Sequence, residues 1–114
     1  SQPAPSADTL TLDGGSRQIG AITETSAGAQ CVVVLTLAEG SSRIGKKWAY
    51  GQNQTPAGGT ATLNQGANTF TIPADYNSGD KSYAVMLGSG DDGEFNYEET
   101  ILTINVGSEE GDQN

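Results

Sequence analysis

"AQCVVVLTL" (residues 29–37) is the stretch that decides the fold. It is the most apolar part of the chain, and its Val and Thr residues are β-branched, which favours extended backbone. A turn signal, Glu39-Gly40-Ser41, follows closely. We therefore predict a strand over residues 29–37 that is buried on both faces, or nearly so.

On either side of this strand, apolar residues recur at period two, and no segment shows the 3.6-residue period of an amphipathic helix. Turn-forming residues separate the runs, as at Asp13-Gly14-Gly15 and Pro56-Ala57-Gly58-Gly59. The further strands predicted in this way cover residues 9–13, 19–23, 47–50, 60–64, 68–73, 82–87 and 100–106. Seven or eight short strands without helices predict an all-β protein, an antiparallel β-sandwich or a small barrel.

The length of 114 residues is typical of one domain, which we place at residues 9–106. Residues 1–8 contain Pro3 and Pro5 among small polar residues, and we expect an extended N-terminal arm that cannot pack by itself. Residues 107–114 are acidic and punctuated by glycine, which predicts a solvated C-terminal tail. We expect a neighbouring subunit to hold these two ends.

Three residues at matching places in the predicted strands carry a family resemblance. Cys31 lies in the second main strand, Trp48 in the next, and Tyr83 stands two positions before Val85 in the penultimate strand. This order resembles the immunoglobulin-type sandwich, whose core holds a cysteine, a tryptophan and a "Tyr-x-Cys" pattern. Val85 occupies the place of the second cysteine, so the chain is similar to the disulfide-free Ig-like modules of bacteria and phages. The resemblance implies an Ig-like sandwich with a buried Cys31 and Trp48.

Composition excludes several classes of function. The chain has 14 acidic and 5 basic residues, a net charge of −9, which disfavours nucleic acid and acidic membrane surfaces as partners. No apolar run approaches the roughly 18 residues of a membrane-spanning helix. The sequence has no histidine and one cysteine, so His-based catalysis, His-ligated zinc and a Cys₄ site are impossible. We predict that the protein is not an enzyme and needs no cofactor.

The basic residues are concentrated in one short segment, "RIGKKWAYGQ" (residues 43–52). Arg43, Lys46 and Lys47 stand beside Trp48, which pleating places on the same face as Tyr50, toward the core. These cations could simply keep a strand end soluble, or they could form a patch that docks on an acidic partner. We treat them as candidate partner-binding residues, together with Pro3 and Pro5 of the N-terminal arm.

The acidic segment "GSGDDGEFNYEET" (residues 88–100) is the second candidate site. Asp91, Asp92 and Glu94 form a weak candidate set for Ca²⁺, although their spacing does not fit an EF-hand loop. The favoured interpretation is a long solvated loop between the last two strands. Its aromatic residues, Phe95 and Tyr97, point away from the acids and are candidate contacts for a partner.

Three functions fit these features. The first is a phage capsid decoration protein on the virion surface, bound to capsid or other virion subunits, with homo-oligomerisation left open. The second is an adhesion or carbohydrate-binding module, secreted or on a bacterial surface, with residues 50–59 as a polar and aromatic sugar site around Tyr50. The third is a surface filament subunit whose N-terminal arm donates a strand to its neighbour.

Overall fold

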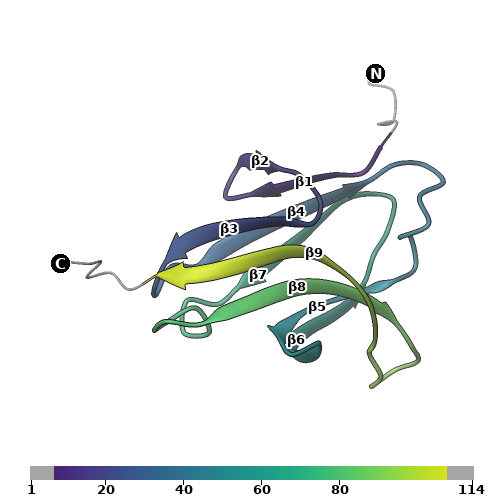
Figure 1. The fold of residues 1–114 in the computed structure, drawn as a ribbon. Coiled ribbons are helices and arrows are strands. Elements are labelled where there is room, and N and C mark those ends of the chain that lie inside the picture. The colour runs from purple at the N-terminus through teal and green to yellow at the C-terminus, as the bar shows by residue number, and fades with distance from the viewer. Residues whose placement is uncertain (1–6, 108–114) are drawn as a thin grey trace.

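The computed structural model describes residues 7–107, which form nine strands in two sheets (Figure 1). The strands are β1 (Thr9–Leu12), β2 (Gly15–Arg17), β3 (Ala21–Ser26), β4 (Cys31–Leu37), β5 (Lys47–Gln52), β6 (Thr55–Thr62), β7 (Gly66–Ile72), β8 (Ser82–Ser89) and β9 (Asn96–Gly107). The all-β sandwich predicted from the period-two pattern is confirmed. Within residues 7–107, no helix is long and apolar enough to cross a membrane.

The two sheets have the strand orders β2-β1-β4-β7 and β3-β9-β8-β5-β6. All pairings are antiparallel except that of β3 with β9, which is parallel, so the expectation of an entirely antiparallel sandwich is wrong at this edge. The reason lies in the connection, because β3 enters the second sheet from a strand of the first sheet rather than through a hairpin. A hairpin would have required an antiparallel partner.

Strand β4 lies inside the first sheet, between β1 and β7. Its residues alternate strictly between fully buried and partly buried positions, and Cys31, Val33 and Leu35 have no exposed surface. The prediction that both faces are buried, or nearly so, is met in full on one face, and Val32 and Val34 on the other face are partly buried. In a two-layer sandwich only one face of each sheet meets the other sheet, and the opposite face borders solvent.

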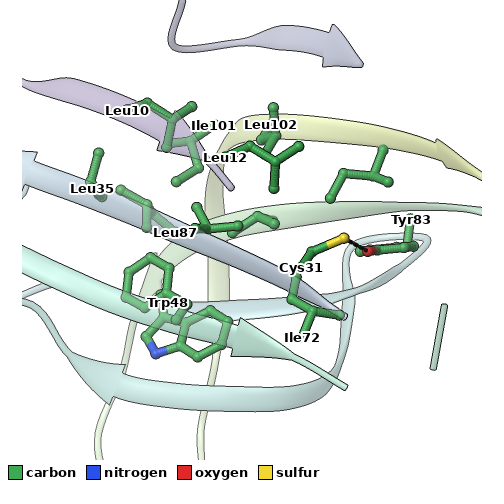
Figure 2. Packing of buried hydrophobic residues seen from close by; sticks show 14 of the residues in the cluster. Leu10, Leu12, Cys31, Leu35, Trp48, Ile72, Tyr83, Leu87, Ile101 and Leu102 are labelled. Carbon is green, nitrogen blue, oxygen red and sulfur yellow. Dashed lines mark hydrogen bonds between the residues drawn. The ribbon is translucent and has the colours of Figure 1, made fainter. Parts of the chain in front are cut away.

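The core lies between the two sheets and is built mainly of Leu, Ile and Val (Figure 2). Trp48 on β5 stacks on Phe70 on β7, with ring centroids 4.1 Å apart and planes inclined by 13°. Tyr50 lies beside Trp48 at 5.9 Å, which confirms that pleating sends both rings to one face. The stack joins strands of different sheets and so fixes the sheets against each other.

Two tight turns place strands where the sequence pattern missed them. Asp13 and Gly14, with φ of 50° and 82°, form a two-residue turn, and Gly15 then begins the unpredicted strand β2. Asn53 and Gln54, with φ of 55° and 60°, form the corresponding turn between β5 and β6. A turn in which both central residues have positive φ has a backbone twist that matches the twist of the two strands it joins.

Strand β6 therefore begins at Thr55, and the predicted turn at residues 56–59 is wrong. These residues belong to a strand at the edge of its sheet, where Pro56 can be accommodated because one side of the ladder is unpaired. A Cβ atom at Gly58 would overlap the ring of Tyr50, so glycine is required there by packing. Strand β9 likewise begins at Asn96 rather than near residue 100, which shortens the predicted loop.

Candidate docking site

The connection from β4 to β5 and the connection from β8 to β9 lie at the same end of the sandwich (Figure 1). Arg43 and Lys46 of the first connection contact Glu99 and Glu98 near the start of β9. Lys47, the first residue of β5, contacts the second connection, although the two segments are more than forty residues apart in sequence. The structure therefore joins the basic candidate segment and the acidic candidate segment into one feature. We call it the ion-pair cluster, and its charged members are Asp8, Arg43, Lys46, Lys47, Glu98 and Glu99.

Arg43 is the centre of the ion-pair cluster. Its Nη1 atom lies 2.5 Å from Oδ2 of Asp8. Its Nε and Nη2 atoms donate to the two carboxylate oxygens of Glu99 at 3.0 and 2.7 Å, which is the two-bond geometry that suits guanidinium and carboxylate. Arg43 thus links Asp8, just before β1, to Glu99 near the start of β9.

Asp8 holds the start of β1 in place through further contacts. Its carboxylate accepts hydrogen bonds from the main-chain N–H of Ala38 and from the hydroxyl of Ser41, both at 2.8 Å. The prediction assigned Asp8 to an extended arm, but its side chain is only 9% exposed and is fixed to the β4–β5 connection. Pro3 and Pro5 lie outside the described residues.

The charges in the cluster stabilise one another. Burial by itself would raise the pKa of Asp8, but the hydrogen bonds from Ala38, Arg43 and Ser41 outweigh it and lower that pKa. Hydrogen bonding to Glu99 is the main cause of a raised pKa at Arg43. Lys46 donates to Glu98 at 2.6 Å and lowers the pKa of Glu98. Asp8, Arg43 and Glu98 therefore stay ionised near neutral pH.

Lys47 fixes the loop between β8 and β9 by a different means. Its ammonium group donates to the carbonyl oxygen of Asp91 and, at 3.1 Å, to that of Glu94. The Glu94 carboxylate also accepts from the main-chain N–H of Asp91 at 3.1 Å. The loop is therefore held both internally and from β5. Contact of Lys47, Arg43 or Lys46 with a partner stays a prediction, and the structure adds that all three already have acceptors within the chain.

A hollow of about 280 Å³ lies beside this loop. It is lined by Pro56 and Thr60 of β6 and by Gly93, Glu94 and Phe95 of the loop. Phe95 is partly buried, and a Cβ atom at Gly88 would lie 2.9 Å from the edge of its ring, so the ring rests closely against β8. Sequence reasoning found Phe95 but missed Pro56 and Thr60, because the register between β5 and β6 decides which edge residues face the loop.

Tyr97 belongs to β9 and not to the loop. It is partly buried, and its hydroxyl lies 2.8 Å from that of Thr100 on the same strand. The acidic residues suggested for calcium are not gathered into a ligand set. Within residues 7–107 no group of three or more Asp, Glu, Cys or His side chains is arranged to hold a metal ion.

A second polar feature lies inside the core, where β4 meets β8. The Tyr83 hydroxyl donates across the two sheets to Sγ of Cys31 at 3.8 Å (Figure 2), and Asn77 donates to the same sulfur at 3.4 Å. Burial is the main cause of a raised pKa at Tyr83. Cys31 is fully buried, as the sequence predicted, and its contacts are structural.

Tyr50, the aromatic residue of the suggested sugar site, is partly buried and packs against the core. Its ring meets that of Tyr76 edge to face, with centroids 4.9 Å apart, and the backbone of Gly58 lies against it. A sugar-binding aromatic side chain needs an accessible ring face, which this packing reduces. Comparison with protein-family models, curated proteins and solved structures finds no match to this chain.

Proposed function

We propose that this chain is an Ig-like, non-catalytic docking protein, and specifically a decoration protein on the head of a phage, bound to capsid subunits. The Ig-like part rests on strand order. Strands β1, β4 and β7 are neighbours as A, B and E are in Ig domains, while β9, β8, β5 and β6 follow the order G, F, C and C′. Cys31, Trp48 and Tyr83 then fall on the strands where Ig domains carry their core landmarks.

The observation that carries the docking function is the fixed loop at residues 90–95 with the hollow beside it. Loops at one end of a rigid sandwich are a frequent place for binding residues. Because Lys47 already orders this loop, a partner that binds it loses little conformational entropy. Phe95 and Pro56 offer apolar surface around a hollow that fits one inserted side chain of a capsid subunit.

The charge distribution supports display on a crowded surface. With 14 acidic and 5 basic residues, neighbouring copies repel one another, which limits aggregation at high local density. Of the 5 basic residues, Arg43, Lys46 and Lys47 lie in the ion-pair cluster at the proposed docking end. In this arrangement that end meets the capsid. It also carries Asp91, Asp92 and Glu94 of the loop, so its cations offset only part of its own negative charge.

The proposal is tested on purified virions. Mass spectrometry of the particles should find this polypeptide in a constant ratio to the major capsid protein. The purified protein, added to particles from a phage with the gene deleted, should sediment with them. Phe95→Ala should weaken this binding at least tenfold, because it removes the ring beside the hollow.

Ile22→Ala is the matched control, since Ile22 is an apolar residue that is 70% exposed on β3 and does not line the hollow. It should bind like the original chain. Urea unfolding of both variants separates loss of contact from loss of folding. Absence of the polypeptide from virions, or equal binding by Phe95→Ala and Ile22→Ala, would contradict the proposal.

A further inference from the structure

Strand β7 is an edge strand without the usual features that prevent edge-to-edge pairing. It ends the first sheet, and its seven residues pair with β4 in an unbroken register. The other three edges in the described part of the chain are protected. Strand β2 has three residues, β6 contains Pro56 and two register shifts, and β3 carries Glu24.

The register shows which main-chain groups β7 presents outward. Asp13 donates its N–H to the carbonyl of Val32 at 2.8 Å. The main-chain N–H and C=O groups of Val32, and of the residues two positions apart from it, therefore point toward β1. The main-chain groups of Val33 and Leu35 therefore point toward β7, where these residues pair with Phe70 and Asn68. The main-chain groups of the alternate β7 residues point away from β4, toward the outside of the sheet. These residues are Ala67, Thr69 and Thr71.

The edge is also free of charge. Residues 48–74, which include β6 and β7, contain no Asp, Glu, Lys or Arg, although the whole chain has a net charge of −9. Two copies of such an acidic molecule repel over most of their surface. Contact through β7 keeps the charges of the two copies apart and desolvates none of them.

We propose that β7 pairs antiparallel with β7 of a second copy, giving a two-fold dimer with one continuous eight-stranded sheet. With Thr69 on the two-fold axis, Thr69 faces Thr69 of the other copy and Ala67 faces Thr71. Each of these three pairs exchanges two N–H···O bonds, about six bonds in all. Thr69 and its two neighbours on this face have small, exposed side chains, so no steric barrier opposes the pairing.

A second copy suits this edge, because each copy carries the same uncharged strand, so the pairing brings no like charges face to face. Asp75, the first charged residue after β7, lies in the turn that follows Pro73 and not in the paired strand. The contact is small by the standard of permanent dimers, so association should be weak and reversible. It does not depend on the proposed capsid function and would join copies through a side of the molecule distinct from the loop at 90–95.

The test is sedimentation velocity of the purified chain from about 10 µM to about 1 mM. The weight-average mass should rise toward that of a dimer, and more so at about 0.5 M NaCl than at about 20 mM, because salt screens the repulsion between acidic copies. Thr69→Lys and Thr69→Glu should each weaken dimerisation about tenfold, since like charges would face each other across the axis.

Mixing the two charged variants provides the decisive control. Lysine and glutamate would then face each other, and the mixture should recover the affinity of the original chain to within about threefold. Ile22→Lys adds the same charge at the β3 edge, where Ile22 is 70% exposed, and should leave dimerisation unchanged. Urea unfolding checks that each variant is folded.

Three results would overturn the inference. A chain that stays monomeric at 1 mM in high salt has no such dimer, and the edge would be open to an extended segment of another protein. A dimer that tolerates Thr69→Lys uses a different surface. A mixture of the Lys and Glu variants that remains monomeric excludes the register centred on Thr69.

Discussion

Replacing Arg43 with methionine should destabilise the fold by about 2–3 kcal/mol, because Arg43 ties three segments together. The variant keeps most of the aliphatic stem and removes only the charged fork. It leaves Asp8 with the two neutral donors from Ala38 and Ser41, and it leaves Glu99 with no partner in the ion-pair cluster. The loss should be visible in urea unfolding as a lower midpoint at unchanged slope.

The expected loss of stability is the sum of the free energies that two unequal contacts of Arg43 contribute. The Arg43–Asp8 pair is shielded, with side-chain exposures of 25% and 9%, and a charge-assisted hydrogen bond of this kind contributes about 1.5–2 kcal/mol. The Arg43–Glu99 pair has the better geometry, but Glu99 is 36% exposed, so solvent screening reduces its contribution to about 0.5–1 kcal/mol. Burial, and not the number of bonds, decides which pair is stronger.

Double-mutant cycles measure the two contributions separately. The coupling free energy between Arg43→Met and Asp8→Asn should exceed the coupling free energy between Arg43→Met and Glu99→Gln by about 1 kcal/mol. Arg17→Met is the matched control, because the described contacts of Arg17 include only a hydrogen bond to the carbonyl of Ser16 next to it. It should change stability by less than about 0.5 kcal/mol. The reasoning fails if Arg43→Met behaves like Arg17→Met, or if the Glu99 coupling is the larger one.

Two further predictions concern pH and packing. The folded-state pKa of Asp8 lies below the ordinary value of 3.8, so ionised Asp8 stabilises the fold above that pH, and this stabilisation is lost as the pH falls through the lowered pKa. The difference in unfolding free energy between the original chain and Asp8→Asn, measured by urea unfolding, should be constant above about pH 5 and shrink below about pH 4. A difference that stays constant over the whole range would refute this. Gly51→Ala should lower the free energy of unfolding, measured by thermal unfolding, by about 2–3 kcal/mol, because the added Cβ atom would overlap the carbonyl of Thr55. Gly107→Ala is the control and should change stability little, since no atom lies within 4 Å of the added Cβ. Equal effects of the two substitutions would contradict the packing argument.

The sequence predicted the strands whose side chains alternate and whose ends carry ordinary turn residues. It missed β2 because the hairpin turn of Asp13 and Gly14 leaves only three residues after it, too few to show a period. It misplaced the start of β6 because Pro and Gly usually mark turns, whereas here they occupy a sheet edge and lie under Tyr50. In both cases tertiary pairing overrode a local signal.

The candidate site was predicted in parts but not as a whole. Arg43, Lys46 and Lys47 were found by their concentration, and Phe95 by its place in an acidic segment. Their joining into one end of the molecule, and the participation of Asp8 and Pro56, followed from strand order and register. Nothing in the local sequence indicates which of the 14 acidic residues each cation will meet.

The sequence by itself determined the all-β class, the burial of Cys31 and the inward direction of Trp48, because period-two patterning and turn chemistry act between near neighbours. Tertiary structure alone decided that Arg43 meets Asp8 and Glu99, which lie 35 and 56 positions away. It also decided which strands became edges. Such contacts depend on how two sheets stack and which strands pair, and this is set by packing of the whole core.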